Sequence, residues 1–283
     1  MKLNSQRTQN IAFFFLFLAT FLVVLPVGLI VLVIIQKGLP AINWQFLTDI
    51  PRQGMRAGGI FPAIVGTIYL VAGAIIFALP IGLLAAIYLS EYSKDTLLTR
   101  IIKLAIVNLA GVPSVVYGLF GLALFVIFLK FGASILSGSL TLGIMILPII
   151  ITTSREALES VPYSFREVSL SLGASKWQTI RHIVLPNAIP GILTGTILGL
   201  GRAAGETAPI LFTVAAFYLP RLPESIFDQA MALPYHLYVI STQVPNVDEK
   251  TRYGTALVLL TLVLVMNLVA IIIRYQFRKK KKW

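Results

Sequence analysis

Long uncharged runs dominate this sequence and set the first limit on its fold. The chain is 57% hydrophobic and only 12% charged, with a mean hydropathy of +0.88, whereas soluble proteins carry about 25% charged residues. Runs long enough for a helix to cross the roughly 30 Å hydrocarbon core of a membrane lie at residues 11–35, 57–90, 104–129, 131–154, 183–219 and 253–273, the fifth broken only by Arg202 and Glu206. Because the runs are continuously apolar rather than alternating, we predict an all-α integral membrane protein, a six-helix bundle rather than a barrel.

The order of these runs suggests a division of the chain. We expect residues 1–57 to form an N-terminal anchor helix and an external loop, because no small-residue cleavage site follows the first run. Residues 58–283 would form a five-helix core that includes a cytoplasmic loop at 155–186 and an external loop at 220–252. Within the external loop, residues 230–247 are apolar but interrupted by prolines, which predicts an interfacial or re-entrant helix rather than a seventh span.

The distribution of positive charge predicts the orientation in the membrane. If both termini are cytoplasmic, 15 of the 23 Lys and Arg residues lie on the inner side, seven lie outside, and Arg202 is left within the membrane. The basic C-terminal cluster is then an anchor at anionic lipid headgroups rather than a nucleic-acid patch. The chain has no cysteine, which excludes disulfides and thiolate metal sites, and its two histidines are isolated, so no metal site is expected.

The cytoplasmic loop has the pattern of two helices joined at a glycine. A helix is expected from about Ser160 to Leu172, ending at Gly173, and a second short helix from Lys176 to about His182, capped by Ser175. Phe165, Val168 and Leu172 recur at helical spacing and form an apolar stripe, as do Trp177 and Ile180. Such stripes either pack on the protein's own helices or the lipid surface, or they dock into a groove of a soluble partner.

The spacing in this loop resembles that of the permease subunits of type I ABC importers. Glu167, Gly173 and the segment 183–186 (IVLP) have the separations of the family's EAA motif, although Val168 and Ser169 stand in place of its two alanines. The resemblance implies a coupling helix that sits in a cleft of a cytoplasmic ATPase. The residues implied to serve this coupling are Phe165, Glu167, Leu172, Gly173, Ala174, Ile183, Leu185 and Pro186.

The sequence itself indicates that the ATPase is a separate chain. It contains no GxxxxGK[ST] phosphate-binding loop, nor any Gly-Lys dipeptide. ATP and Mg²⁺ would be used by the partner ATPase, and the chain would bind no cofactor and catalyse no reaction. A membrane-bound enzyme would need a cluster of His, Asp or Glu at an interface, and that cluster is missing.

The fifth run contains two charged residues, which are unfavourable within a membrane. A charge at mid-membrane costs at least about 2.5–3.5 kcal/mol, and Arg202 and Glu206, four residues apart among small residues, can partly neutralise each other. They form either a structural ion pair that fixes helix register or a gate on a polar route for a charged solute. In the third run, Pro113 should break the helix and leave backbone groups for Ser114 or a substrate to satisfy, with Tyr117 one turn further on.

A narrower resemblance suggests which solute passes. RAAGETAPILFT (202–213) and GVPSVVYGLFGL (111–122) resemble segments of phosphate-specific transport permeases. The resemblance implies import of inorganic phosphate across the bacterial cytoplasmic membrane. The translocation residues that we assign on this basis are Arg202, Glu206, Thr207, Ser114 and Tyr117.

The same resemblance implies the partners. They would be a second, homologous permease subunit, two ATPase subunits, an extracytoplasmic phosphate-binding protein and membrane lipid, with no nucleic acid. Two alternatives stay open: a permease for another oxyanion, such as molybdate or sulfate, and a secondary transporter driven by an ion gradient. The second would be expected to carry more intramembrane carboxylates than Glu206.

Overall fold

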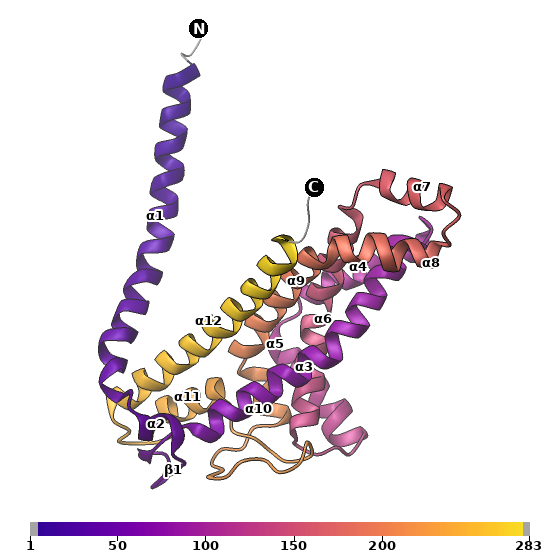
Figure 1. The fold of residues 1–283 in the computed structure, drawn as a ribbon. Coiled ribbons are helices and arrows are strands. Elements are labelled where there is room, and N and C mark those ends of the chain that lie inside the picture. Colours follow the sequence, from indigo (N-terminus) through magenta and orange to yellow (C-terminus); the bar gives the residue numbers. More distant parts are fainter. Residues whose placement is uncertain (1–4, 280–283) are drawn as a thin grey trace.

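The structure, a computed structural model, describes residues 5–279, and the described part is almost entirely helical (Figure 1). Two short antiparallel strands of two residues each pair Pro51 with Gly58 and Arg52 with Ala57. The elements in chain order are α1 (Ser5–Gly38), η1 (Leu39–Ala41), α2 (Trp44–Thr48), β1 (Pro51–Arg52), β2 (Ala57–Gly58), α3 (Phe61–Ile87), η2 (Tyr88–Tyr92), α4 (Leu97–Ala110), α5 (Ser114–Gly121), η3 (Leu122–Phe128), α6 (Ile135–Glu159), α7 (Tyr163–Ser171), α8 (Lys176–Thr179), η4 (Ile180–Val184), α9 (Leu185–Gly205), α10 (Ala208–Thr213), α11 (Leu233–Thr242) and α12 (Glu249–Lys279).

The helices that could cross a membrane agree with the prediction, with one difference in how they are counted. Five are long and apolar enough: Gln9–Ala41, Phe61–Tyr92, Ile135–Glu159, Lys176–Gly205 and Glu249–Lys279. The pair Leu97–Ala110 and Ser114–Phe128 makes a sixth if the two pieces count as one span. The all-α membrane fold is therefore confirmed, and the expected third helix is two pieces.

The core of the bundle is built by α3 and α6, with α9 against α6. Leu142, Met145, Ile146 and Ile150 of α6 are completely buried in it. Small residues allow the close approach: a Cβ added to Gly82 of α3 would lie 2.7 Å from the side chain of Ile150. Close packing through small residues is the usual way in which helices associate within lipid.

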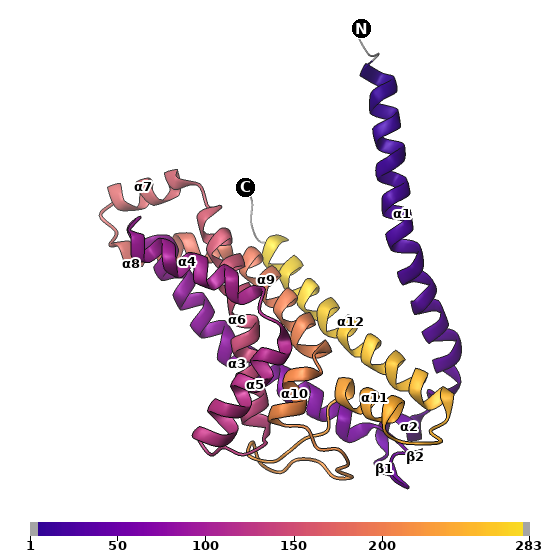
Figure 2. The same cartoon turned by 180° about the vertical axis from the view of Figure 1, so that it is seen from behind.

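The first helix stands apart from this core. In both views α1 diverges from α12 toward its N-terminal end, and the two helices meet only at the opposite end (Figures 1 and 2). There Lys37 Nζ lies 2.7 Å from Glu249 Oε1, and a Cβ on Gly38 would lie 2.6 Å from the carbonyl oxygen of Tyr253. The most apolar stretch of α1 is not buried against the rest of the chain.

Both described ends of the chain lie on one side of the bundle. The start of α1, the end of α12 and helix α7 are at the top of Figure 1, whereas β1, α2 and α11 are at the bottom. This arrangement puts the termini on the same side as the loop that contains α7, as the charge distribution predicts. Of the inner-side charges counted above, Lys2, Lys280, Lys281 and Lys282 lie outside the described residues.

Two of the predicted spans are broken, the third at Pro113 as expected and the fifth after Gly205. At Gly111–Pro113 the chain bends by 102°, so that α4 points away from α5 instead of extending it. Pro113 explains the break, because proline has no N–H to donate and disfavours helical geometry in the residue before it. The fifth run, residues 183–219, was expected to form one spanning helix, but α9 ends at Gly205 and a short α10 follows.

The external loop contains the predicted short helix, in a more buried position than expected. Helix α11 has ten residues and buries Leu233, Tyr235, His236 and Val239 among others. The backbone N–H of Leu233 donates to Thr67 Oγ1 of α3 at 2.8 Å. The helix is thus part of the bundle's outer end rather than a segment lying on the membrane surface.

Candidate translocation site and coupling loop

The break between α9 and α10 places two charges at the end of a membrane helix. Glu206 has an extended backbone, with φ −77° and ψ 139°, directly after Gly205. Arg202 Nε lies 3.6 Å from Glu206 Oε1, and the two side chains are 29% and 18% exposed. The predicted pair therefore forms, but as a loose and partly exposed pair rather than a tight buried one.

The second broken helix packs directly against this break. Helix α5 contacts α10, and the two approach closely at Gly118, where an added Cβ would lie 3.1 Å from both the carbonyl oxygen of Ala208 and Pro209 Cα. Thr207 immediately precedes α10, and Ser114 is the first residue of α5. Both are half-buried. The structure thus brings the starts of two short helices and the charged pair into one region.

Tyr117 has a more structural place than the sequence suggested. Its side chain is 5% exposed, and its hydroxyl donates to the carbonyl oxygen of Leu109 at 2.7 Å. Leu109 is in the last turn of α4, where carbonyls have no partner within the helix. Tyr117 therefore ties the two pieces of the bent pair together.

This arrangement can attract an anion without holding it permanently. A partly exposed guanidinium offers donors in a fork that suits tetrahedral oxyanions. The carboxylate of Glu206, 3.6 Å from Arg202, would repel the same anion. Binding of an anion would therefore require Arg202 to release Glu206 and pair with the anion instead. Exposure of Arg202 within a spanning helix requires that water or another subunit face it.

The cytoplasmic loop forms the predicted helix, glycine turn and cap, with corrections at both ends. Gly173 is in the left-handed region at φ +84°, and its N–H donates to the carbonyl oxygen of Leu170 at 2.9 Å. Ser175 and Gln178 form a reciprocal capping box. The expected helix start at about Ser160 is wrong: Ser160 is the C-cap of α6, and α7 begins only after Pro162.

The predicted short second helix is also wrong, because it does not end near His182. From Lys176 the helix continues to Gly205 as one element, with a π-helical turn at Ile180–Val184. This turn directly precedes Pro186, which cannot donate to the helical ladder, and wider turns often accommodate such a residue. Ile183 and Leu185 are half-buried and Pro186 is exposed.

The apolar stripe of α7 divides into an inner and an outer part. Phe165 is half-buried and packs against a cluster that includes Ile180 and Val184. Val168 and Leu172 instead are 60% and 83% exposed. Trp177 is 49% exposed, Glu167 and Gly173 are exposed, and Ala174 is half-buried. The loop thus presents an apolar surface to the surroundings, which we call the docking face (Val168, Leu172 and Trp177).

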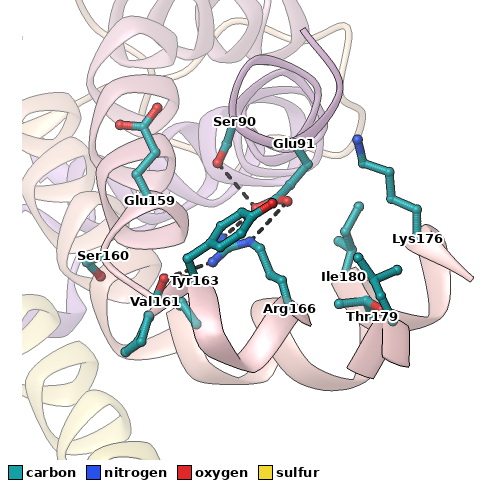
Figure 3. A pocket seen from close by; sticks show the side chains of 12 residues that line it. Ser90, Glu91, Glu159, Ser160, Val161, Tyr163, Arg166, Lys176, Thr179 and Ile180 are labelled. Atoms are coloured by element: carbon teal, nitrogen blue, oxygen red, sulfur yellow. Dashed lines mark hydrogen bonds and ion pairs between the residues drawn. The ribbon is translucent and has the colours of Figure 1, made fainter. Parts of the chain in front are cut away.

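Arg166, which follows Phe165 and lies off the apolar stripe, makes several short hydrogen bonds to other elements. Its Nη2 donates to Glu91 Oε1 at 2.7 Å and its Nε to Glu91 Oε2 at 3.3 Å, across a separation of 75 residues (Figure 3). The two side chains are only 12% and 8% exposed. No sequence pattern marks this pair, because neither residue lies in a motif.

Comparison with known proteins identifies the family. Residues 78–283 match the family described as binding-protein-dependent transport system inner membrane component. The chain belongs to this family. It is 33% identical to the probable ABC transporter permease protein YqgI of Bacillus subtilis, over 89% of this chain and 90% of that one. It is 32% identical to the phosphate transport system permease protein PstA 1 of Mycobacterium tuberculosis (strain H37Rv), over 100% of this chain and 92% of that one.

Solved structures show the same permease fold. A bacterial alginate ABC transporter, in complex with a periplasmic protein that holds an alginate pentasaccharide, matches with a TM-score of 0.65 at 15% identity, covering 95% of this chain and 96% of that chain. The MetNI methionine ABC transporter, described as inward facing, matches with a TM-score of 0.58 at 15% identity, over 77% and 94% of the two chains. These likenesses confirm the type I ABC importer permease fold.

Membership in the permease family settles several of the sequence-based expectations. The chain is a multi-pass inner-membrane subunit of an ABC importer and a transport component rather than an enzyme. A permease of this family works with an ATPase and a substrate-binding protein. The individual roles of Arg202, Glu206 and the loop residues stay predictions.

Proposed function

We propose that this permease is a subunit of an ATP-driven importer of inorganic phosphate and forms one half of its translocation pathway. Its relatives in Mycobacterium tuberculosis, Mycobacterium leprae and Xylella fastidiosa are described as phosphate transport system permease proteins PstA. The similarity extends over nearly the whole chain rather than the coupling loop alone. This extent favours phosphate over molybdate or sulfate as the cargo.

The observation that carries the proposal is the position of Arg202. It is a cationic fork at the end of a spanning helix, partly exposed, next to the break after which α10 starts. Phosphate is an anion that accepts paired hydrogen bonds from a guanidinium. Arg202 would attract it, and Glu206, Thr207 and Ser114 would line its path, with Tyr117 holding the bent pair in place.

The proposed partners are those of a four-component importer. A second permease, PstC-like, would complete the pathway, facing the exposed side of the Arg202 region. Two PstB-like ATPase subunits, which would use ATP and Mg²⁺, would receive the docking face of this chain and its counterpart. A PstS-like protein would deliver phosphate from outside. Both termini would be cytoplasmic, with α1 forming an anchor arm beside the core, whereas Phe46 and Met55 of the same N-terminal segment already pack within that core.

Uptake by the reconstituted importer tests the proposal. The complete complex, in vesicles loaded with ATP and Mg²⁺, should accumulate radiolabelled phosphate, and excess sulfate or molybdate should not compete. Arg202→Met should abolish uptake while the ATPase still co-purifies. Arg274→Met is a matched control, because Arg274 also belongs to a spanning helix but donates to Thr194 Oγ1. Uptake that needs no ATP, or that is stronger for sulfate or molybdate, would contradict the proposal.

A further inference from the structure

Resting on the proposed function, we propose that Arg166 and Glu91 form the joint through which movement of the coupling helix α7 reaches α3 and α6. Both are positioning residues for transport: they touch neither phosphate nor nucleotide. The proposal concerns how the ATPase-driven displacement is transmitted. It assigns a role to two residues that the coupling motif does not contain.

The contacts of Arg166 join three elements at one point. Its guanidinium bonds both carboxylate oxygens of Glu91, which belongs to η2 at the cytoplasmic end of α3. Nη1 donates to the carbonyl oxygen of Val161 at 2.8 Å, and Nη2 donates to that of Leu158, near the end of α6, at 2.9 Å. All three nitrogens are therefore engaged. A planar guanidinium held by so many acceptors has little freedom to turn.

Apolar packing attaches α7 through Phe165, which is half-buried against the cluster that includes Ile180 and Val184. None of the residues of α7 is fully buried. Between α7, the start of α8 and the end of α3 lies a pocket of about 570 Å³, lined by residues that include Ser90, Tyr163 and Lys176 (Figure 3). A displacement of α7 would meet open space there rather than a filled core. The ion pair crosses this space and would transmit the displacement directly.

The surroundings show why this joint is stiffer than the other polar contacts of the loop. Ser169 Oγ and Thr179 Oγ1 lie 2.9 Å apart, but they connect α7 only to α8 within the loop. Lys176 Nζ lies 4.8 Å from the centre of the Tyr92 ring, a contact that tolerates sliding. Arg166 and Glu91 instead form a charge-assisted, nearly buried pair with fixed bidentate geometry.

The test compares variants that weaken the joint to different degrees. Glu91→Gln keeps the size of the side chain and leaves Arg166 its two carbonyl acceptors, and Arg166→Lys keeps the charge without the fork. Arg166→Met removes the joint but leaves Glu91 buried without a cationic partner, so it is the variant that could fail to fold. The matched controls are Arg100→Met and Asp95→Asn, an exposed pair on the same side of the bundle, 3.1 Å apart.

The decisive measurement is the number of phosphate ions transported per ATP hydrolysed by the reconstituted complete importer. We expect this ratio to fall about tenfold in Glu91→Gln and Arg166→Lys, within the range typical of coupling between sites. The amount of co-purified ATPase and its ATP hydrolysis should stay unchanged. The controls should keep the wild-type ratio.

Each other outcome has a defined meaning. If the wild type is active and both Glu91→Gln and Arg166→Lys transport as many phosphate ions per ATP as the wild type, the proposed joint is wrong. Loss of co-purified ATPase, or of the chain itself, in these two variants overturns it also, because the pair would then serve docking or folding. Absence of ATP-driven phosphate uptake in the wild type would instead overturn the proposed function.

Discussion

The carboxylate of Glu206 lies 3.6 Å from Nε of Arg202, although Glu206 is already outside the helix that carries Arg202. The pair therefore spans the end of α9. Since the backbone at Glu206 is extended, a change at the break moves the carboxylate without moving the guanidinium. The two charges can separate by local rearrangement, which a pair within a continuous helix cannot do.

Neutralising Glu206 should tighten phosphate binding and slow its release. In Glu206→Gln the guanidinium loses its competing anion. The phosphate concentration that gives half-maximal uptake should fall about fivefold, corresponding to the roughly 1 kcal/mol of a partly exposed ion pair, and the maximal rate should fall with it. Uptake measured against phosphate concentration checks both. Glu206→Asp is the control. If Glu206→Gln left the half-saturating phosphate concentration unchanged, Glu206 would not compete with phosphate for Arg202.

A side chain at Gly173 should impair coupling through the backbone rather than through collision. The residue has φ +84° with open space around its Cα, so Gly173→Ala meets only the left-handed penalty of about 1–2 kcal/mol. Gly132→Ala is a matched control, with φ +69° and equally open space. We expect reduced phosphate uptake per complex only for Gly173→Ala. Equal effects of the two variants, or normal uptake by Gly173→Trp, would contradict the coupling role.

A charge on the docking face should release the ATPase. Leu172 is 83% exposed, so Leu172→Asp should leave the chain itself stable and yet reduce the amount of ATPase recovered with it. Leu97→Asp, at a residue that is 76% exposed on α4, is the control. Quantitative co-purification from detergent measures the result. Full recovery of ATPase with Leu172→Asp would argue that the exposed apolar side chains of α7 face lipid.

Because α5 and α10 approach closely, adding a methyl group at Gly118 should destabilise the protein. In Gly118→Ala the new Cβ would lie 3.1 Å from backbone atoms of Ala208 and Pro209, and overpacking of this kind costs about 1–3 kcal/mol. Thermal unfolding followed by tryptophan fluorescence should show a lower midpoint. For Gly111→Ala, where the nearest atom is 3.5 Å away, little change is expected, and equal midpoints for the two variants would disprove the tight contact.

Acid should loosen the external loop through Asp228. Its carboxylate accepts the backbone N–H groups of Glu224 and Ser225, and these bonds lower its pKa. A lowered carboxyl pKa stabilises the loop above the unfolded value of about 3.9 and loses that effect as pH falls through the folded-state value. A spin label on Ile226→Cys should therefore become mobile only at strongly acidic pH. Adding Asp228→Asn should make it mobile at neutral pH; an immobile label there would refute the role.

Features that depend on local sequence could be predicted well. Apolar length identified the spans, and Gly173 and Ser175 identified the turn and the cap, because each acts on its own neighbours. The angle of the bend between α4 and α5, 102°, could not be predicted from the sequence. Pro113 marks a break, but its angle depends on how α5 packs against α10.

Features that depend on contacts between residues far apart in the sequence could not be predicted. The buried position of α11 follows from its packing against α3 and α12 rather than from its own hydropathy. Glu91 is separated from Arg166 by 75 residues, and each alone looks like an ordinary solvated charge. Phe165 and Leu172 share one stripe in the sequence, yet only the turn of the loop decides that one faces inward and the other outward.

The helix that begins after the Ser175 cap is the same helix that ends at Gly205, one residue before Glu206. It has 30 residues, which at about 1.5 Å per residue makes a rod roughly 45 Å long, longer than the membrane is thick. Pivoted at its middle, such a rod moves each end by roughly 2 Å for a tilt of about 5°. A small displacement beside the ATPase would thus arrive at Arg202 reversed in direction and undiminished in size.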